Sequence, residues 1–303
     1  MRVSRVFVGL IGALLAGPAI AQEAFTYSYN GYSAELPVKP QRVFVMDSRT
    51  GLDFAVSAGF PIVATDWDAD VGSHFERDLP VGTDKLAFRG EPNAELVLTY
   101  DPDLLVVGKG WWTYWQDQAM FRADKFPVLV VEDANSADWR QLFLNQMTAF
   151  GQGERAARLI AEYEAAVVDA RPRIAAALKG RRVAILDIWG GDTMALQVDT
   201  FSTAIAQELG IDLVTGDDTV AAEDGYKRYS AENLAVLSDA ALILSLWTGD
   251  MANNPLWQRL PAIERGAQYE MDIANSWGFA LTATDFVGDV LEAVEILEKA
   301  DAQ

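Results

Sequence analysis

The sequence predicts an α/β protein of two lobes, each with a central, mostly parallel sheet flanked by helices. One long α-helix bridges the lobes and leaves a cleft between them. Three observations carry this prediction. Short apolar runs alternate with amphipathic stretches in the first half, a charged helical segment lies in the middle, and the alternation resumes after Gly180. Strands that alternate with helices are typical of parallel sheets.

The first half contains four apolar runs with the length of buried strands and four amphipathic stretches with helical periodicity. We expect strands at residues 42–46, 62–65, 104–107 and 128–131, and helices at 51–58, 93–100, 114–123 and 137–150. These elements predict an N-terminal lobe at residues 22–152.

The middle of the chain has a different texture. From Glu154 to Leu178, apolar residues recur at helical spacing within an alanine-rich, charged segment. A helix of about 25 residues spans roughly 37 Å, which is long enough to join two lobes. We therefore expect a bridging helix at residues 153–179.

The second half returns to alternating strand and helix patterns. We expect strands at residues 182–186, 240–246 and 269–272, and helices at 201–209, 231–237, 255–264 and 284–299. Together they predict a C-terminal lobe at residues 180–303.

The first 21 residues have the features of a cleavable export signal. Arg2 and Arg5 form a short basic region, residues 6–16 an apolar run, and Ala19-Ile20-Ala21 a small-x-small cleavage site. The sequence contains no cysteine, the residue that a bacterial lipoprotein needs at its cleavage site. We therefore expect a periplasmic protein that is released and is not a lipoprotein.

The composition argues against several classes of function. With 24 basic and 44 acidic residues, the chain has a net charge of −20, which repels nucleic acid and keeps a protein dispersed. We expect no nucleic-acid partner and a monomer. The single histidine, His74, and the absence of cysteine leave little scope for a nucleophilic triad or a transition-metal site. We expect no enzyme activity and no cofactor.

Aromatic residues gather beyond the ends of expected strands, where open α/β sheets bind ligands. Aromatic walls in both lobes would then face a common cleft. The residues are Trp111, Trp112, Tyr114, Trp115, Trp189, Trp247 and Trp277. Two arginines, Arg49 and Arg89, are candidates to donate hydrogen bonds to an oxygen-rich ligand in that cleft. For Arg49, a surface ion pair is an equal alternative.

The stretch from Arg89 to Leu96, Arg-Gly-Glu-Pro-Asn-Ala-Glu-Leu, runs on to Asp101-Pro102-Asp103-Leu104. It resembles the periplasmic siderophore- and cobalamin-binding proteins of ABC importers, and most closely the ferric hydroxamate (ferrichrome-type) binding proteins. Further matches lie at residues 40–43, 171–174 and 254–258 and at Gly266. The resemblance implies two α/β lobes joined by one long helix.

The resemblance also implies roles for particular residues. Arg89 would contact the hydroxamate oxygens around iron, and the aromatic cluster after residue 107 and Trp277 would line the pocket. Tyr226 is the nearest residue to a further pocket tryptophan of the family that has no clear equivalent here. Glu95 and Glu232 would dock onto the two arginine-bearing subunits of a membrane permease. An internal repeat supports this pair, because Ala-Glu precedes a turn and a strand at both places.

Two alternatives remain open at this point. The ligand could be haem or cobalamin, and Tyr226, Tyr229 or His74 could then supply the axial ligand that haem requires. The chain could instead be an exported α/β hydrolase, although it has no nucleophile motif. The favoured reading is a solute-binding protein for a ferric siderophore, with iron bound only as the chelate.

Overall fold

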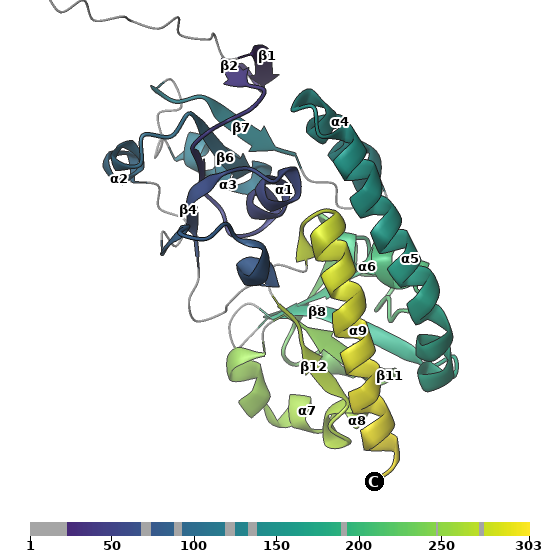
Figure 1. The fold of residues 1–303 in the computed structure, drawn as a ribbon. Coiled ribbons are helices and arrows are strands. Elements are labelled where there is room, and N and C mark those ends of the chain that lie inside the picture. Colours follow the sequence, from purple (N-terminus) through teal and green to yellow (C-terminus); the bar gives the residue numbers. More distant parts are fainter. Residues whose placement is uncertain are drawn as a thin grey trace, which may run out of the picture.

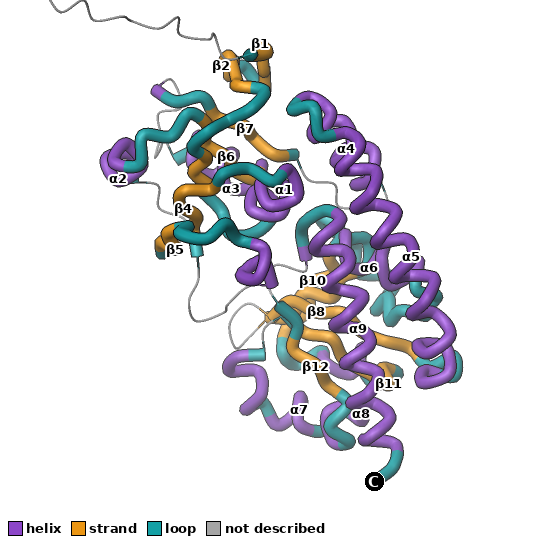
Figure 2. The backbone as a smooth tube through the Cα atoms, in the orientation of Figure 1, coloured by secondary structure: helices purple, strands orange, loops and turns teal. Residues whose placement is uncertain are grey.

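The computed structural model describes residues 23–67, 74–87, 93–118, 125–132, 138–188, 193–246, 248–272 and 276–303. Two α/β lobes lie one beyond the other, and two long helices run along one side (Figure 1). Strands gather in two separate sheets with helices around each (Figure 2). The predicted fold class is confirmed.

The N-terminal lobe contains a five-stranded sheet in which every pairing is parallel. Its order is β5-β4-β3-β6-β7, with bounds Asp84–Leu86, Ile62–Asp66, Val43–Val45, Leu104–Gly108 and Val128–Val131. The helical elements of this lobe are α1 (Thr50–Ala58), the 3-10 helix η1 (His74–Asp78), α2 (Ala94–Thr99), α3 (Lys109–Asp117) and α4 (Trp139–Ala149).

A β-hairpin that the sequence analysis did not predict precedes this sheet. It consists of β1 (Ala24–Tyr29) and β2 (Tyr32–Pro37), and its turn, Asn30-Gly31, has positive φ at both residues. An Asn-Gly turn between alternating apolar residues is a strong local hairpin signal. The hydroxyl of Tyr27 donates to the carbonyl of Val130 at 2.8 Å, which ties the hairpin to the lobe.

The bridging helix is α5 (Gly153–Leu178), which has 26 residues. It packs against α4 of the first lobe and against α9 (Ala280–Asp301) of the second, as Figure 1 shows. None of the helices in the described part of the chain is both long and apolar enough to cross a membrane.

The second sheet is mixed, whereas a mostly parallel sheet was expected. Its order is β10-β9-β8-β11-β12, with bounds Tyr226–Ser230, Thr193–Gln197, Arg182–Ile188, Ala240–Ser245 and Gln268–Glu270. Strands β8, β11 and β12 are parallel, while β9 runs antiparallel to both of its neighbours. The short strands β9 and β10 were not expected.

The helices of the second lobe are α6 (Phe201–Glu208), α7 (Pro255–Gln258), α8 (Pro261–Glu264) and α9, with the 3-10 helices η3 (Leu234–Leu237) and η4 (Gly249–Asn253). The helices expected at 231–237 and 255–264 are shorter in the structure, whereas α9 is longer than the expected 284–299. Pro261 divides the helix expected at 255–264, because Leu260 before it is extended.

Candidate ligand site between the lobes

A cavity of about 400 Å³ opens between the lobes, at the carboxyl ends of β3 and β6. This is the end of a parallel sheet at which ligands generally bind. Its lining combines the buried carboxylate of Asp47, the half-buried side chain of Arg49, two glycines and three aromatic side chains. The lining residues are Asp47, Arg49, Thr50, Gly108, Gly110, Trp111, Tyr114 and Trp277.

Asp47 fixes the first-lobe wall of this cavity. Its carboxylate accepts hydrogen bonds from the backbone N–H groups of Arg49 (2.9 Å), Gly51 (3.2 Å) and Gly108. Side chains at Gly51 and Gly108 would crowd the carboxylate, so glycine permits this close approach. Burial raises the pKa of Asp47 above its ordinary value, although these three N–H groups oppose the shift.

Arg49 reaches from the first lobe to the second. Its guanidinium carbon lies 4.8 Å from the ring centre of Trp277, a cation–π contact across the cavity. Burial lowers the pKa of Arg49, while the negative charges of Asp47 and Asp187 oppose that shift. Arg49 therefore lies in the cavity, next to carboxylates of both lobes, and not in an exposed ion pair.

Asp187 lies near the carboxyl end of β8 and is 1% exposed. Its Oδ1 accepts a hydrogen bond from Nε2 of Gln197, whose Oε1 accepts from the Thr200 hydroxyl at 2.6 Å. Its Oδ2 is buried and has no hydrogen-bond partner. Burial raises the pKa of Asp187 to about 6, although Gln197, Tyr226 and Arg49 each lower it.

Tyr226, the first residue of β10, lies beside this carboxylate. Its hydroxyl is close enough to Asp187 to influence the pKa of both groups, but it makes no hydrogen bond of standard geometry. Burial, and then the charge of Asp187, raise the pKa of Tyr226. The second lobe thus places two buried polar groups, the Asp187 carboxylate and the Tyr226 hydroxyl, beside each other behind the cavity lining.

The aromatic cluster after β6 divides into two pairs because it is helical. Trp111 and Tyr114 line the cavity, and Tyr114 is 49% exposed. Trp112 and Trp115 are only 5% and 1% exposed and pack in the first lobe's core. All four were predicted to face the cleft, and this prediction is wrong for Trp112 and Trp115. Residues three apart share one helix face, so two faces of α3 separate the pairs.

Three candidate ligand-binding residues, Arg89, Trp189 and Trp247, lie outside the described residues. The two candidate docking glutamates are both exposed. Glu95 lies in the first turn of α2, whose N-terminus is capped by Asn93 through a 3.0 Å bond to the N–H of Leu96. Glu232 lies in a turn before η3, not in the helix expected there.

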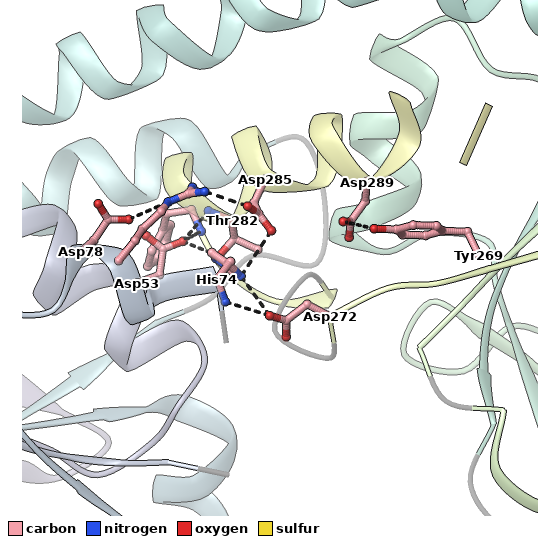
Figure 3. A network of polar contacts seen from close by, with 10 residues as sticks. Asp53, His74, Asp78, Tyr269, Asp272, Thr282, Asp285 and Asp289 are labelled. Carbon is pink, nitrogen blue, oxygen red and sulfur yellow. Dashed lines mark hydrogen bonds and ion pairs between the residues drawn. The ribbon is translucent and has the colours of Figure 1, made fainter. Parts of the chain in front are cut away.

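The remaining candidates lie away from the cavity lining. The Tyr229 hydroxyl accepts a hydrogen bond from the N–H of Asp217 at 2.9 Å, next to a second hollow of about 560 Å³ that Glu232 also lines. His74 lies in a polar network that joins the two lobes (Figure 3). Its Nδ1 is 3.4 Å from Asp272 and 3.5 Å from Asp285.

Comparison with known proteins decides the family. The model of a family described as periplasmic binding protein matches residues 46–273, which is most of the chain. The chain belongs to the periplasmic binding protein family. This membership makes it a binding protein and not an enzyme, as the sequence predicts, and it supports a place outside the cytoplasm.

One similar protein is the probable siderophore-binding lipoprotein YfiY of Bacillus subtilis (strain 168). It is 20% identical over an alignment of 259 residues, and the match covers 80% of this chain and 78% of that protein. Two solved structures share the fold at 16% identity. FhuD of Vibrio cholerae, bound to Fe³⁺–Desferal, has a TM-score of 0.68 over 84% of this chain and 97% of that chain.

The second is FeuA of Bacillus subtilis, a triscatecholate siderophore-binding protein solved with ferri-bacillibactin. Its TM-score is 0.69, and the match covers 89% of this chain and 98% of that chain. At such identities the likeness establishes the fold of this periplasmic binding protein.

Proposed function

We propose that this protein captures a ferric siderophore, of the hydroxamate type, in the cavity between its lobes and delivers it to an ABC importer. The observation that carries the proposal is the pairing of one half-buried guanidinium with three aromatic side chains that line the cavity. Arg49 offers several hydrogen-bond donors to chelate oxygens, while Trp111, Tyr114 and Trp277 offer faces to the carbon shell. The siderophore-binding names of the relatives point the same way.

A chelated iron needs no ligand from the protein. Among the described residues, no group of three or more His, Asp or Glu side chains is arranged to hold a metal ion. This agrees with a protein that recognises the organic shell of the complex and leaves the coordination of iron to the siderophore.

The charges in the cavity support the hydroxamate class. Three hydroxamates balance the charge of Fe³⁺ and give a neutral chelate, whereas three catecholates leave an excess of negative charge. Two buried carboxylates, Asp47 and Asp187, lie near the guanidinium of Arg49. An anionic complex would be repelled by them at short range, where water screens poorly. The neighbours hold different siderophores, so the fold alone does not select the ligand.

Arg89, Trp189 and Trp247 complete the proposed ligand site, and Glu95 and Glu232 form the proposed contacts with the permease. We further propose that the protein is monomeric and is released into the periplasm through a cleavable signal. The relative YfiY is named a lipoprotein, but this sequence contains no cysteine that could carry such a lipid.

Quenching of tryptophan fluorescence tests the function directly. The protein is titrated with a ferric tris-hydroxamate, a ferric triscatecholate, haem and cobalamin. We expect saturable quenching with the lowest Kd for the hydroxamate. Tighter binding of haem, visible as a Soret band, or of cobalamin would replace the proposed ligand. No binding of any ferric siderophore would remove the proposal.

Substitution of the arginines locates the ligand. Arg49→Ala and Arg89→Ala are each expected to weaken binding by about 1.5–3 kcal/mol, the usual value of a hydrogen bond to a charged group. Arg259 is exposed in the second lobe and serves as the control, because Arg259→Ala makes the same change of charge away from the cavity. An unchanged Kd in both arginine variants would place the ligand elsewhere.

A further inference from the structure

We propose that Gln197 is a positioning residue that, through the hydroxyl of Ser276, fixes Trp277 in the second-lobe wall of the cavity. Gln197 is the last residue of β9 and is 1% exposed. It lies behind the cavity lining, so it acts on the ligand only through Trp277. The inference rests on the proposed function, because it takes Trp277 to be a ligand contact.

The side-chain amide of Gln197 makes three hydrogen bonds, each to a different segment of the second lobe. Its Nε2 donates to Asp187 Oδ1 on β8 and to the Ser276 hydroxyl at 3.2 Å, and its Oε1 accepts from the Thr200 hydroxyl at 2.6 Å. Thr200 is the N-cap of α6, and Ser276 directly precedes Trp277. Gln197 therefore ties β8, the start of α6 and the segment that carries Trp277 to one point.

The chemistry of these partners requires an amide at position 197. Burial raises the pKa of Asp187 to about 6, so this group is ionised at neutral pH, and a carboxylate only accepts hydrogen bonds. The amide nitrogen must therefore face Asp187, and its second hydrogen is directed to Ser276. A glutamate would have no hydrogen to donate to either partner. The bond to Ser276 thus depends on the residue type as well as on its place in the strand.

The segment that carries Trp277 is held on both sides of this residue. Ser276 is 1% exposed and bonds to β9 of the second lobe, while the N–H of Phe279 donates to Asp53 of the first lobe at 2.7 Å. Trp277 lies between these two points, and its ring centre is 4.8 Å from the guanidinium carbon of Arg49. Anchored neighbours reduce the conformational freedom of the ring, and this lowers the entropic cost of ordering it on binding.

A purely structural role for Gln197 is the alternative, since buried hydrogen bonds also stabilise the lobe. The two roles differ in what loss of the Ser276 hydroxyl does to the folded protein. If the bond is only structural, the variant is less stable but Trp277 keeps its place. If the bond positions Trp277, the ring moves although the protein remains folded.

The test uses Ser276→Ala, which removes the link and leaves the other two bonds of Gln197 intact. The matched control is Ser245→Ala. Ser245 is also buried in the second lobe, and its hydroxyl also accepts from a glutamine Nε2, that of Gln268, at 3.2 Å. We expect similar falls in Tm in the two variants, because each loses a buried hydrogen bond of the same kind.

Fluorine NMR of the ligand-free protein, prepared with fluorinated tryptophan, reports on Trp277 directly. Each of the nine tryptophans gives a resonance, and Trp277→Phe identifies the one that belongs to Trp277. We expect this resonance to shift or broaden in Ser276→Ala and to stay unchanged in Ser245→Ala. An unchanged resonance in Ser276→Ala would overturn the inference. An equal change in both variants would indicate a general loosening of the lobe and would overturn it too.

Ligand binding connects the position of Trp277 to recognition. Ser276→Ala should raise the Kd for a ferric tris-hydroxamate about threefold to tenfold, the range that one neutral hydrogen bond allows. Gln197→Met removes both donated bonds and should raise the Kd at least as much. The double variant should bind like Gln197→Met alone, because both substitutions act through the same bond. Additive losses of affinity would show that the two residues act separately, which contradicts the inference.

These measurements separate the inference from the proposed function. If the Trp277 resonance changes in Ser276→Ala but the wild type binds no ferric siderophore, Gln197 positions the ring and the proposed function fails. If the wild type binds the siderophore but the Kd of Ser276→Ala is unchanged, the proposed function stands and the positioning role fails.

Discussion

Two buried aspartates near the junction of the lobes differ in how their oxygens are used. Asp53, on α1, is completely buried and uses both oxygens. Its Oδ1 accepts from the Ser57 hydroxyl at 2.9 Å, and its Oδ2 from the N–H of Phe279 (2.7 Å) and both the N–H (3.1 Å) and hydroxyl (2.6 Å) of Thr282. Asp187 is as deeply buried, but its Oδ2 makes no hydrogen bond of standard geometry, and the carboxylate lies beside the Tyr226 hydroxyl.

The difference is that Asp53 connects the two lobes directly, whereas Asp187 bonds to Gln197 within its own lobe. Phe279 has no side chain that could cap α9, and Asp53 supplies the cap from the other lobe (Figure 3). Gly278 permits this approach, since a side chain there would crowd Thr282 and Asp53. A saturated carboxylate holds the lobes in place.

The largest effect is expected from Asp53→Ala. It leaves the capped N–H groups at the start of α9 and the Ser57 hydroxyl without their partner. We expect the free energy of unfolding to fall by about 3 kcal/mol or more, because buried polar groups cost energy when unpaired. Urea unfolding measures it. The exposed-site variant Asp218→Asn is the control, and a loss below about 1 kcal/mol would contradict the fastening role.

A second polar network, between α4 and α6, should contribute somewhat less to the free energy of unfolding. Arg140 donates to both oxygens of Glu208, at 3.1 and 2.5 Å, and the Tyr163 hydroxyl donates to Glu208 at 2.9 Å. The Glu208 side chain is 28% exposed, so water can replace part of this network. We expect Glu208→Gln to lower the unfolding free energy by about 1.5–2 kcal/mol. Arg173→Gln, which breaks an exposed pair with Glu295, should cost under about 1 kcal/mol.

His74 makes the stability of the junction between the lobes depend on pH, with the same sign as Asp187, because the folded-state pKa of both groups is raised. Burial would lower its pKa, but Asp272 and Asp285 raise it above the ordinary value. The protonated histidine is therefore more stable in the folded protein, and this stabilisation is complete below the unfolded pKa of about 6.5 and lost as pH rises through the folded pKa. Relative to His74→Gln, the wild type should gain about 1 kcal/mol at pH 5.5 and less at pH 9. If the difference in unfolding free energy between the wild type and His74→Gln grew as pH rises, this prediction would be contradicted.

The smallest effect on stability is expected at the exposed carboxylates. Replacing both Glu95 and Glu232 with alanine should change the unfolding free energy by less than about 0.5 kcal/mol and leave ligand affinity intact. If Glu95 and Glu232 both contact the permease, import of the ligand into cells should fail in the double variant. Charge reversal to lysine should be worse, because like charges would then meet. Normal transport by the double variant would remove the docking proposal.

Much of the fold could be predicted from the local pattern of apolar and polar residues. The apolar runs that became β3, β4, β6, β7, β8 and β11 were expected within a few residues, as was α5. The unexpected strands β9 and β10 are short and partly polar, with Tyr-Lys-Arg-Tyr-Ser in β10. Pairing with neighbours stabilises them, and that pairing leaves little trace in composition.

The candidate site was harder to predict. The resemblance drew attention to Arg89, whereas composition and position brought Arg49, Trp111 and Trp277 together only as members of a longer set. Asp187 was missed, because a single aspartate at the end of a strand looks like many others. Its distinguishing features are burial and an unpaired oxygen, and neither is visible without neighbours.

The sequence by itself determined the two-lobe architecture and its bridging helix, because hydrophobic periodicity is a local property of the chain. It also showed the shortage of histidine and cysteine, from which we expect weak binding of bare metal ions. Only the tertiary structure decided which aromatic residues of α3 face the cavity and which fill the core. It alone placed Arg49 between carboxylates of two lobes, because such contacts join distant segments whose meeting depends on how the whole chain packs.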